Sequence, residues 1–302
     1  MCGKRETNRI MPTTYNDLYL DIRRELKRAG LEAASLEARE LVCFGSGRSR
    51  EEFYRDGAVE LSPEAEAAVR ALARRHLDGE PVAYLIGEWE FYGLTLEISP
   101  AVLIPRVDTE VLAEAAIQFV GSLESCRLLD LCTGSGCIGL AAAASAAGCR
   151  ALLGDVSREA LRICRRNIRR CALAERVKAE VLDALAPPPQ GIGQFQSITC
   201  NPPYIPSGEI ETLDLSVRDY EPRLALCGGE DGYDFYRSVA RDWKTALTAG
   251  GRLYFEVGAG QAETVRRLME AEGFCDAVVI PDSQGIPRVV YGTWPYGKLQ
   301  KR

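Results

Sequence analysis

The stretch NPPY at residues 201–204 places an amide, two prolines and a phenol directly after a short apolar run, residues 197–200. Two successive prolines stiffen the backbone and remove two N–H donors, and a residue before proline is kept out of helical geometry. The side-chain oxygen of Asn201 and the carbonyl of Pro202 would then form a rigid pair of acceptors for the two hydrogens of an –NH2 group. The ring of Tyr204 would pack against the planar group that carries this nitrogen.

Such an acceptor pair suits methyl transfer to a nitrogen whose lone pair is delocalised. Holding both N–H bonds favours a pyramidal nitrogen and turns its lone pair toward an electrophilic methyl group, so that no base has to remove a proton first. Orientation for in-line attack contributes several kcal/mol, and acceptors preorganised for the developing positive charge add to it. Two prolines followed by a loop tyrosine are equally compatible with a plain strand end, so the interpretation depends on a donor site nearby.

A glycine-rich turn upstream, LLDLCTGSGCIGLA at residues 128–141, offers such a site. It carries Gly134, Gly136 and Gly139 between a predicted strand and a predicted helix, which is formally the G-x-G-x-x-G pattern of dinucleotide-binding folds. The pattern alone is weak evidence, because glycines also serve tight turns and close helix packing. The acidic residues around it indicate which ligand it favours.

Three acidic residues, Asp130, Asp155 and Asp183, stand at the ends of three successive predicted strands. Ligands of parallel sheets bind beyond these ends. Asp130 is placed to face a cationic amino-acid tail, Asp155 to accept from a ribose diol and Asp183 to accept from an adenine amino group; charge-assisted bonds contribute roughly 1.5–3 kcal/mol each. Any one of them could instead cap the next helix. Together they favour S-adenosylmethionine (SAM) over NAD, whose pyrophosphate they would not accommodate.

The composition is that of a soluble globular protein: 302 residues, 46% hydrophobic and 26% charged, with a formal net charge of −6. This length predicts one large or two modest domains, and the negative charge disfavours binding by neutralisation of many phosphates. No apolar run approaches the ~18–20 residues of a membrane span, and the N-terminus lacks a secretory pattern, so we expect a cytoplasmic protein with no membrane partner. Residues 1–10 are interpreted as a loose extension.

Eleven cysteines are scattered along the chain without a CxxC pair, which is typical of small apolar side chains in a reducing compartment. The single histidine, His76, falls in a charged helical stretch and is expected to face solvent. A zinc site or a Ser-His-Asp triad is therefore not expected, and no metal is predicted.

The elements that must position these groups fall into three regions. Residues 1–86 predict a small helical domain for substrate docking, because apolar residues recur at helical spacing in YNDLYLDIRRELKRAGL and SPEAEAAVRALARRHLDG. Residues 87–104 alternate in polarity and carry aromatics, which predicts a β-hairpin linker. Residues 105–302 alternate strands with helices, which predicts a mostly parallel sheet covered on both faces.

Within the last region the predicted strands are CRLLDL (126–131), CRALLG (149–154), RVKAEVL (176–182), SITC (197–200), RLYFEVG (252–258) and a closing hairpin of DAVVIP (276–281) with RVVYGTW (288–294). A helix is expected over residues 234–251. Another, over 157–172, carries six arginines that are interpreted as a solvated face.

Taken together, LDLCTGSGCIGLA and NPPY resemble the class I SAM-dependent methyltransferases that act on planar nitrogen. These enzymes share a Rossmann-like α/β fold with a seven-stranded, mostly parallel sheet. More narrowly, the chain is similar to the HemK/PrmC family of protein-(glutamine-N5) methyltransferases from about residue 15 to its C-terminus. The segments that carry this resemblance are PVAYLIGEWEFYG, LIPRVDTEVL, NPPYIP, EPRLALCGGEDGYDFYR and PRVVYG. NPPY alone is shared with DNA adenine methyltransferases, so the LIPR and EPRLAL segments are the more specific.

The resemblance implies methyl transfer from SAM to the side-chain amide N5 of the glutamine in the Gly-Gly-Gln motif of class 1 peptide chain release factors. It implies that the methionine part of SAM lies along Cys132, Thr133, Gly134, Ser135 and Gly136. Asp155 would hold the ribose, and Asp183 and Ala184 would flank the adenine. The residues implied to bind the glutamine are Asn201, Pro202, Pro203 and Tyr204, with Asn201 also next to SAM.

Three positions depart from the family pattern. Cys132 stands where the family usually has glycine, and Ala184 stands where a larger residue often packs on the base. Both substitutions are expected to soften SAM affinity without removing a group needed for the chemistry. Val107 replaces the usual proline of PRPDTE and is expected to be harmless.

Two alternatives share the predicted nitrogen-holding site. One is methylation of a ribosomal-protein glutamine, and the other is a nucleic-acid adenine-N6 methyltransferase, which must extrude its base. Arginine and glutamate are nearly balanced in the helical domain, which favours a protein substrate; no nucleic-acid partner is expected, and the enzyme is expected to be a monomer. An NAD-dependent oxidoreductase lacks support, because no Tyr-x-x-x-Lys occurs and the sole histidine lies outside the α/β region. An intact NPPY disfavours a noncatalytic SAM-binding scaffold.

Overall fold

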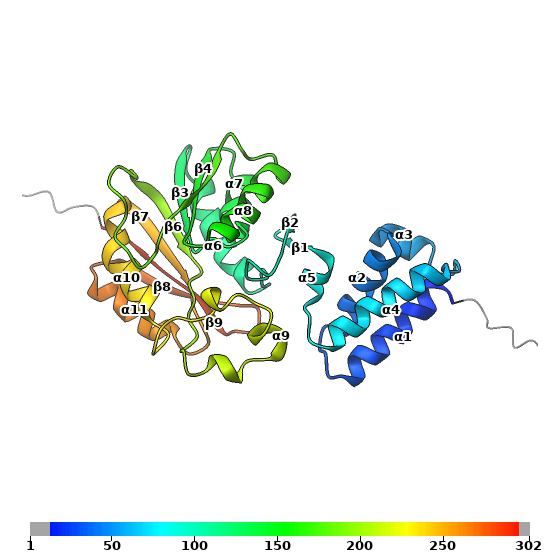
Figure 1. The fold of residues 1–302 in the computed structure, drawn as a ribbon. Helices are drawn as coiled ribbons and strands as arrows, with labels where there is room; N and C mark the ends of the chain where they lie inside the picture. The colour runs from blue at the N-terminus through cyan, green and yellow to red at the C-terminus, as the bar shows by residue number, and fades with distance from the viewer. Residues whose placement is uncertain (1–12, 296–302) are drawn as a thin grey trace, which may run out of the picture. The chain divides into compact units, whose positions relative to one another are not determined.

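The computed structural model describes residues 13–295, and the extension predicted for residues 1–10 lies outside them. The chain divides between Ile86 and Gly87 into two compact units, whose elements are labelled in Figure 1.

The first unit is a bundle of helices. These are α1 (Tyr15–Arg28), α2 (Ala34–Ser46), α3 (Arg50–Arg55), α4 (Pro63–Leu77) and α5 (Val82–Ile86). Leu18, Ile22 and Leu26 recur at helical spacing in α1 and are fully buried, so this apolar stripe holds α1 against α2 and α4. A capping box between Thr14 and Asp17 starts α1 by satisfying backbone N–H groups that have no partner within the helix.

His76 is buried in this bundle, so the expectation of a solvent-facing histidine is wrong. Its Nδ1 lies 2.8 Å from the Glu80 carbonyl, and its Nε2 lies 3.4 Å from Glu37 Oε2. Burial lowers the pKa of His76, but the bonds to Glu37 and to the Glu80 backbone outweigh this effect, so that the pKa is raised. The charged neighbours in sequence suggested an exposed position, whereas the imidazole is buried, with Nδ1 hydrogen-bonded to the Glu80 backbone and Nε2 facing the Glu37 carboxylate.

The second unit is built on a seven-stranded sheet in the order β5-β4-β3-β6-β7-β9-β8. Its strands are β3 (Cys126–Leu131), β4 (Cys149–Asp155), β5 (Val177–Val181), β6 (Phe195–Cys200), β7 (Leu247–Glu256), β8 (Cys275–Pro281) and β9 (Pro287–Thr293). The pairs among β5, β4, β3, β6 and β7 are parallel, and β9 runs antiparallel to both β7 and β8. The mostly parallel sheet with an antiparallel C-terminal hairpin is therefore confirmed. The strand order reverses between β3 and β6, a topological switch point at which such sheets bind ligands.

Helices pack on both faces of this sheet (Figure 1). They are α6 (Thr109–Gly121), α7 (Cys137–Ser145), α8 (Arg158–Arg170), α10 (Asp234–Asp242) and α11 (Ala262–Ala271). The long segment between β6 and α10 carries the short helices η1 (Ile210–Thr212), α9 (Leu215–Arg218) and η2 (Arg223–Ala225), and η3 (Trp243–Ala246) precedes β7. Successive residues of a strand face opposite sides. Leu129 of β3 accordingly joins a core cluster with Tyr236 of α10 and Val265 of α11, whereas Asp130 accepts from Gly139 N of α7.

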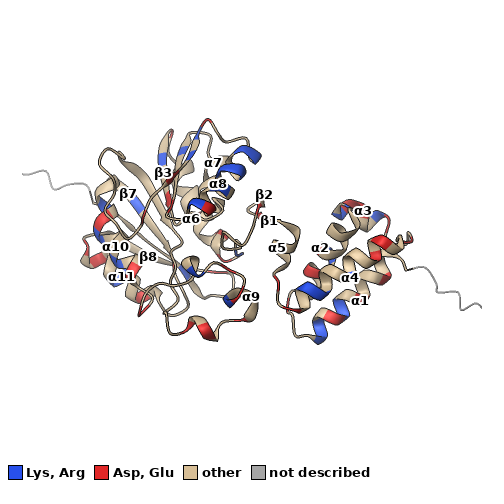
Figure 2. Cartoon of the chain, in the orientation of Figure 1, with Lys and Arg blue, Asp and Glu red and all other residues tan. Residues whose placement is uncertain are grey.

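A two-stranded hairpin, β1 (Glu88–Phe91) with β2 (Leu94–Glu97), begins the second unit. It is tied to α8, along which Figure 2 shows several arginines. Arg166 lies 2.7 Å from Glu97, and Arg170 lies 2.5 Å from Glu88. All the α8 arginines are exposed, as expected for a solvated face, yet two of them serve to fasten the hairpin.

Asn167 on the opposite side of α8 links the hairpin to the glycine turn. Its side chain is fully buried and accepts from Glu97 N at 2.7 Å. Its amide donates to Glu97 O at 3.0 Å and to Ser135 O at 2.9 Å. All these polar groups are therefore satisfied inside the fold, which a buried amide requires.

The helix expected over residues 234–251 is wrong in its second half. The α-helix α10 ends at Asp242, η3 follows, and β7 begins at Leu247. Leu247 is buried and pairs with Phe195 of β6. Pairing with a strand some fifty residues earlier thus overrides the local helical preference of this segment.

The cysteines that the structure describes are all free. Within residues 13–295, no helix is both long and apolar enough to pass through a bilayer.

Candidate active site

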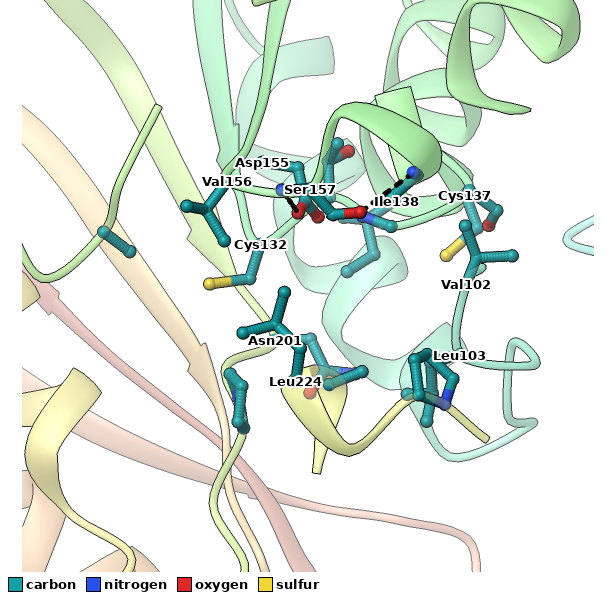
Figure 3. Close-up of a pocket in the computed structure, with 18 of the residues that line it drawn as sticks. Val102, Leu103, Cys132, Cys137, Ile138, Asp155, Val156, Ser157, Asn201 and Leu224 are labelled. Atoms are coloured by element: carbon teal, nitrogen blue, oxygen red, sulfur yellow. Dashed lines mark hydrogen bonds between the residues drawn. The ribbon is translucent and has the colours of Figure 1, made fainter. Parts of the chain in front are cut away.

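A cavity of about 290 Å³ opens at the carboxyl ends of β3, β4 and β6, at the switch point of the sheet (Figure 3). The predicted site residues that line it are Cys132, Thr133, Gly134, Ser135, Asp155, Asp183, Ala184, Asn201 and Pro203. The structure thus brings the glycine turn, two of the strand-end acids and the asparagine of NPPY to one cavity. Gly136, Pro202 and Tyr204 are outside its lining.

The glycines of the turn have different physical roles. Gly134 and Gly136 have φ of 55° and 89°, in the left-handed region that only glycine enters without strain. Gly139 lies within α7, where an added Cβ would meet Leu153 Cδ2 at 2.2 Å. The first two glycines therefore shape the turn, and the third lets α7 approach the sheet.

Cys132 also adopts a left-handed conformation, with φ of 56°. A residue with a Cβ is disfavoured there by roughly 1–2 kcal/mol. The conformation gives a physical reason for glycine in the family pattern at this position. Its side chain lines the cavity, so the departure places a thiol where other members would present backbone.

Asp130 does not face a ligand, and this part of the interpretation is wrong. The carboxyl is fully buried beneath the turn and is absent from the cavity lining. It accepts from the hydroxyls of Thr133 and Thr199, the latter at 2.7 Å, and from Gly139 N at 3.4 Å. Burial raises its pKa to about 6. Asp130 therefore holds the glycine turn to β6 and α7.

Asp155 ends β4 and lines the cavity. Its two oxygens accept from Gly134 N and Ser157 N, each at 2.8 Å. Ser157 itself caps α8 by accepting from Ala160 N at 3.1 Å, so the helix has a cap without Asp155. Burial raises the pKa of Asp155, and the hydrogen bonds from backbone N–H groups lower it by a smaller amount, so that the net shift is upward. A carboxylate oxygen accepts more than one hydrogen bond, which leaves capacity for a hydroxyl in the cavity.

The segment after β5 and the loop after β4 form an apolar slot. Ala184 is buried, and Asp183 is exposed and accepts from Leu185 N at 2.9 Å. Val156 and Leu185 line the cavity although they are 47% and 45% exposed. Neither residue was singled out from the sequence, and the signal that could have found them is a large apolar residue one or two positions after a strand-end acid, as Val156 follows Asp155 and Leu185 follows Asp183.

Asn201 follows β6 and is half-buried in the cavity wall. Its Nδ2 lies 3.4 Å from the hydroxyl of Thr109, to which it donates. Thr109, at the start of α6, also lines the cavity. The amide nitrogen is thus directed to the protein, which leaves the amide oxygen as the end available to a ligand.

Tyr204 is half-buried behind the cavity. Gln261 Nε2 donates to its carbonyl at 3.0 Å, and its ring lies so close to Gly258 that a Cβ there would meet Tyr204 Cδ2 at 3.0 Å. Burial raises the pKa of its hydroxyl to about 12. Packing of this ring on a substrate remains a prediction.

Two loops to which sequence reasoning gave no role complete the wall. The lining residues from these loops are Ala101, Val102, Leu103, Pro105, Pro222, Leu224 and Ala225. The two loops are joined by an ion pair between Arg106 and the buried Glu221, which also accepts from Ile104 N at 3.3 Å. The LIPR and EPRLAL segments therefore act as one structural unit.

Comparison with known proteins places this architecture in a family. Residues 17–87 match the family model described as PrmC N-terminal domain, and residues 109–219 match the one described as Conserved hypothetical protein 95. The structure resembles the hMettl16 catalytic domain in complex with MAT2A 3'UTR hairpin 1, with a TM-score of 0.56 over 86% of this chain and 92% of that chain. The two are 15% identical, so this likeness shows the fold alone.

Curated relatives match nearly the whole chain. The release factor glutamine methyltransferase of Geobacter sulfurreducens is 40% identical over 269 residues, 88% of this chain and 92% of that protein. The release factor glutamine methyltransferase of Bradyrhizobium diazoefficiens is 39% identical over 273 residues, 88% of this chain and 90% of that protein. The chain is a SAM-dependent methyltransferase of class I fold, and it belongs to the release factor glutamine methyltransferase family.

Proposed function

We propose that this enzyme methylates the side-chain amide N5 of a glutamine in peptide chain release factors, at the Gly-Gly-Gln motif of class 1 factors. The observation that carries the proposal is that Asn201 lines the same cavity as Asp155 and the glycine turn. An acceptor for an amide –NH2 therefore stands beside a site suited to a nucleoside with an amino-acid arm.

The residues present fit SAM. Asp155 retains acceptor capacity toward the cavity, and the slot formed by Val156, Ala184 and Leu185 is apolar, as a planar base requires. The turn from Cys132 to Ser135 would hold the methionine part. When bound, SAM supplies an electrophilic methyl group on a positively charged sulfur.

The contribution of the NPPY segment is to hold and orient the acceptor nitrogen. The Asn201 oxygen accepts from one amide N–H of the glutamine, and the Pro202 carbonyl accepts from the other. Both prolines are buried, so the acceptors stay fixed as positive charge develops on nitrogen. The apolar lining around Asn201, with Pro203 and Leu224, restricts water at the reacting atoms.

The protein substrate is supported by the helical unit as well as by the relatives. Residues 17–87 match the PrmC N-terminal domain, and we infer that this unit docks the release factor in the cytoplasm while the second unit carries the chemistry. A ribosomal-protein glutamine and a nucleic-acid adenine are the competing acceptors.

The experiment is incubation with methyl-labelled SAM and a release factor, either wild type or with its Gly-Gly-Gln glutamine changed to alanine. Mass spectrometry is expected to find one added methyl group on that glutamine and none on the alanine variant. Ribosomal proteins and RNA serve as parallel acceptors; label on either in place of the release factor would refute the proposal.

Asn201→Ala tests the role of the acceptor amide. We expect SAM affinity by calorimetry to change little and turnover to fall by about 100-fold or more, the scale found for a single preorganised hydrogen-bonding group. Wild-type turnover in this variant would show that the cavity amide does not hold the substrate.

A further inference from the structure

A buried carboxyl stands directly behind Asn201. Glu256, the last residue of β7, is 4% exposed and does not line the cavity. The Thr109 hydroxyl and the Asn201 amide lie near enough to its carboxyl to lower its pKa, while its Oε2 has no hydrogen-bond partner among the described residues. A buried carboxyl with an unpaired oxygen reduces the free energy of unfolding, so packing alone does not explain a glutamate at this position.

Thr109 completes the arrangement. It is the first residue of α6, is 2% exposed and lies 3.4 Å from Asn201 Nδ2 through its Oγ1. A hydroxyl has one proton to donate and two lone pairs. When the Thr109 proton goes to Glu256, only its lone pairs face Asn201, and they accept from the amide nitrogen.

An asparagine amide has one donating end and one accepting end, and its two orientations differ little in shape. A carboxylate only accepts, so Glu256 and Thr109 together admit the N–H end and reject the oxygen. We propose that Glu256 and Thr109 are positioning residues that hold the Asn201 amide in the orientation that presents its oxygen to the substrate nitrogen. This inference rests on the proposed function, because it assumes that the Asn201 oxygen holds the acceptor.

The charge of Glu256 links this orientation to pH. Burial raises its pKa to about 7, against the opposing effects of the Thr109 hydroxyl and the Arg288 guanidinium. The other ionisable groups around it are Asp108 before α6, Tyr204 after β6, Tyr236 of α10 and Cys137 of α7. Arg288 of β9 is itself held by Asp108 at 2.8 Å and Asp282 at 3.0 Å.

Protonation turns Glu256 from a pure acceptor into a donor. A protonated carboxyl can donate to the Asn201 oxygen, which stabilises the reversed and unproductive amide. Turnover is therefore expected to fall as pH decreases through about 7. The positive charge of a bound sulfonium favours the carboxylate form, which lowers the pKa of Glu256 and moves the fall in turnover to lower pH.

The test compares Thr109→Val, which keeps the shape and removes the hydroxyl, with Thr109→Ser, which keeps the hydroxyl. We expect Thr109→Val to lower kcat by about 10-fold, the value of one hydrogen bond, with SAM affinity by calorimetry nearly unchanged. Thr109→Ser is expected to recover most of this loss. Equal kcat in the two variants would overturn the role of the hydroxyl.

Glu256→Gln removes the titration while keeping the size of the side chain. We expect its kcat to fall at pH 8 and to lose the dependence on pH between 6 and 8 that the wild type shows. The matched control is Glu263→Gln on the exposed face of α11, where Glu263 pairs only with Arg266 and Arg267 in the described structure; it is expected to keep the wild-type rate and pH profile. A wild-type pH profile in Glu256→Gln would overturn the inference.

The outcomes separate this inference from the proposed function. An inactive Asn201→Ala together with a fully active Thr109→Val would refute the positioning role and leave the acceptor role intact. An active Asn201→Ala would refute both. If Glu256→Gln lowers the melting temperature so far that kinetics cannot be measured, the two Thr109 variants still decide the question.

Discussion

At the residue scale, Cys132 combines a strained backbone with a position in the cavity wall. Its φ of 56° favours glycine, but replacing it by glycine also removes a side chain that packs on the core cluster. Comparing Cys132→Gly with Cys132→Ala isolates the backbone effect, because both variants lose the thiol.

We predict that Cys132→Gly is more stable to urea than Cys132→Ala by about 1 kcal/mol, since alanine keeps the left-handed strain. Calorimetry on the same two proteins shows whether the thiol contributes to SAM affinity. Equal stability of the two would mean that the turn relaxes when the sulfur is removed.

Asp155 provides the residue-scale prediction for the donor site. We expect Asp155→Ala to weaken SAM binding by about 10- to 100-fold, since hydrogen bonds to a charged group contribute about 1.5–3 kcal/mol each. Isothermal calorimetry measures this directly. Ser157→Ala is the contrast, because loss of the α8 cap is expected to reduce the free energy of unfolding by about 1 kcal/mol. Unchanged affinity in Asp155→Ala would assign this carboxylate to the turn alone.

At the scale of elements, the cavity depends on two wall loops that are held together by a buried ion pair. The ion pair of Arg106 with Glu221 joins the loop before α6 to the loop before η2, and the Glu221 side chain is only 1% exposed. Removing one partner of a buried pair leaves the other charge uncompensated, whereas replacing both by apolar residues does not.

Arg106→Met is therefore predicted to reduce the free energy of unfolding by about 2–3 kcal/mol and to raise KM for the protein substrate. The Arg106→Met/Glu221→Leu double variant should recover much of the stability. Urea unfolding of the two single variants and the double variant provides the coupling energy; strict additivity would show that the pair does not hold the loops together.

At the scale of the whole molecule, two buried carboxyls make stability depend on pH. Burial raises the pKa of Asp130 from 3.8 to about 6 and that of Glu256 from 4.5 to about 7. The folded state therefore binds these protons more tightly than the unfolded chain does. The stabilisation is complete below the unfolded pKa values and is lost as pH rises through about 6 and about 7.

Glu256→Gln isolates one of the two contributions. At pH 4 the variant and the wild type should be similarly stable, because both side chains are neutral. At pH 8 the variant should be more stable by up to about 3 kcal/mol, from a shift of 4.5 to about 7 at 1.36 kcal/mol per unit. Urea unfolding at both pH values without SAM checks this, and a difference that does not grow with pH would contradict the raised pKa.

Local pattern was sufficient for much of this molecule. Alternating apolar strands and helices predicted the parallel sheet, and the limits of the first strand, residues 126–131, agree with β3. The glycine turn and NPPY were recognisable because backbone freedom at glycine and rigidity at proline are properties of single residues. A parallel sheet then brings strand ends to one edge, which is why Asp155 and Asn201 meet in one cavity.

The burial and hydrogen-bond partners of several polar residues were decided by contacts between residues distant in sequence. The sequence by itself determined the fold class, the glycine turn and the NPPY segment, because each depends on the types and spacing of residues that are close together in the chain. Only the tertiary structure turned Asp130 away from the cavity toward Thr199, buried His76 and placed Glu256 and Thr109 behind Asn201. Hydrogen bonding and burial depend on which elements pack together, and these partners lie tens of residues apart in the chain.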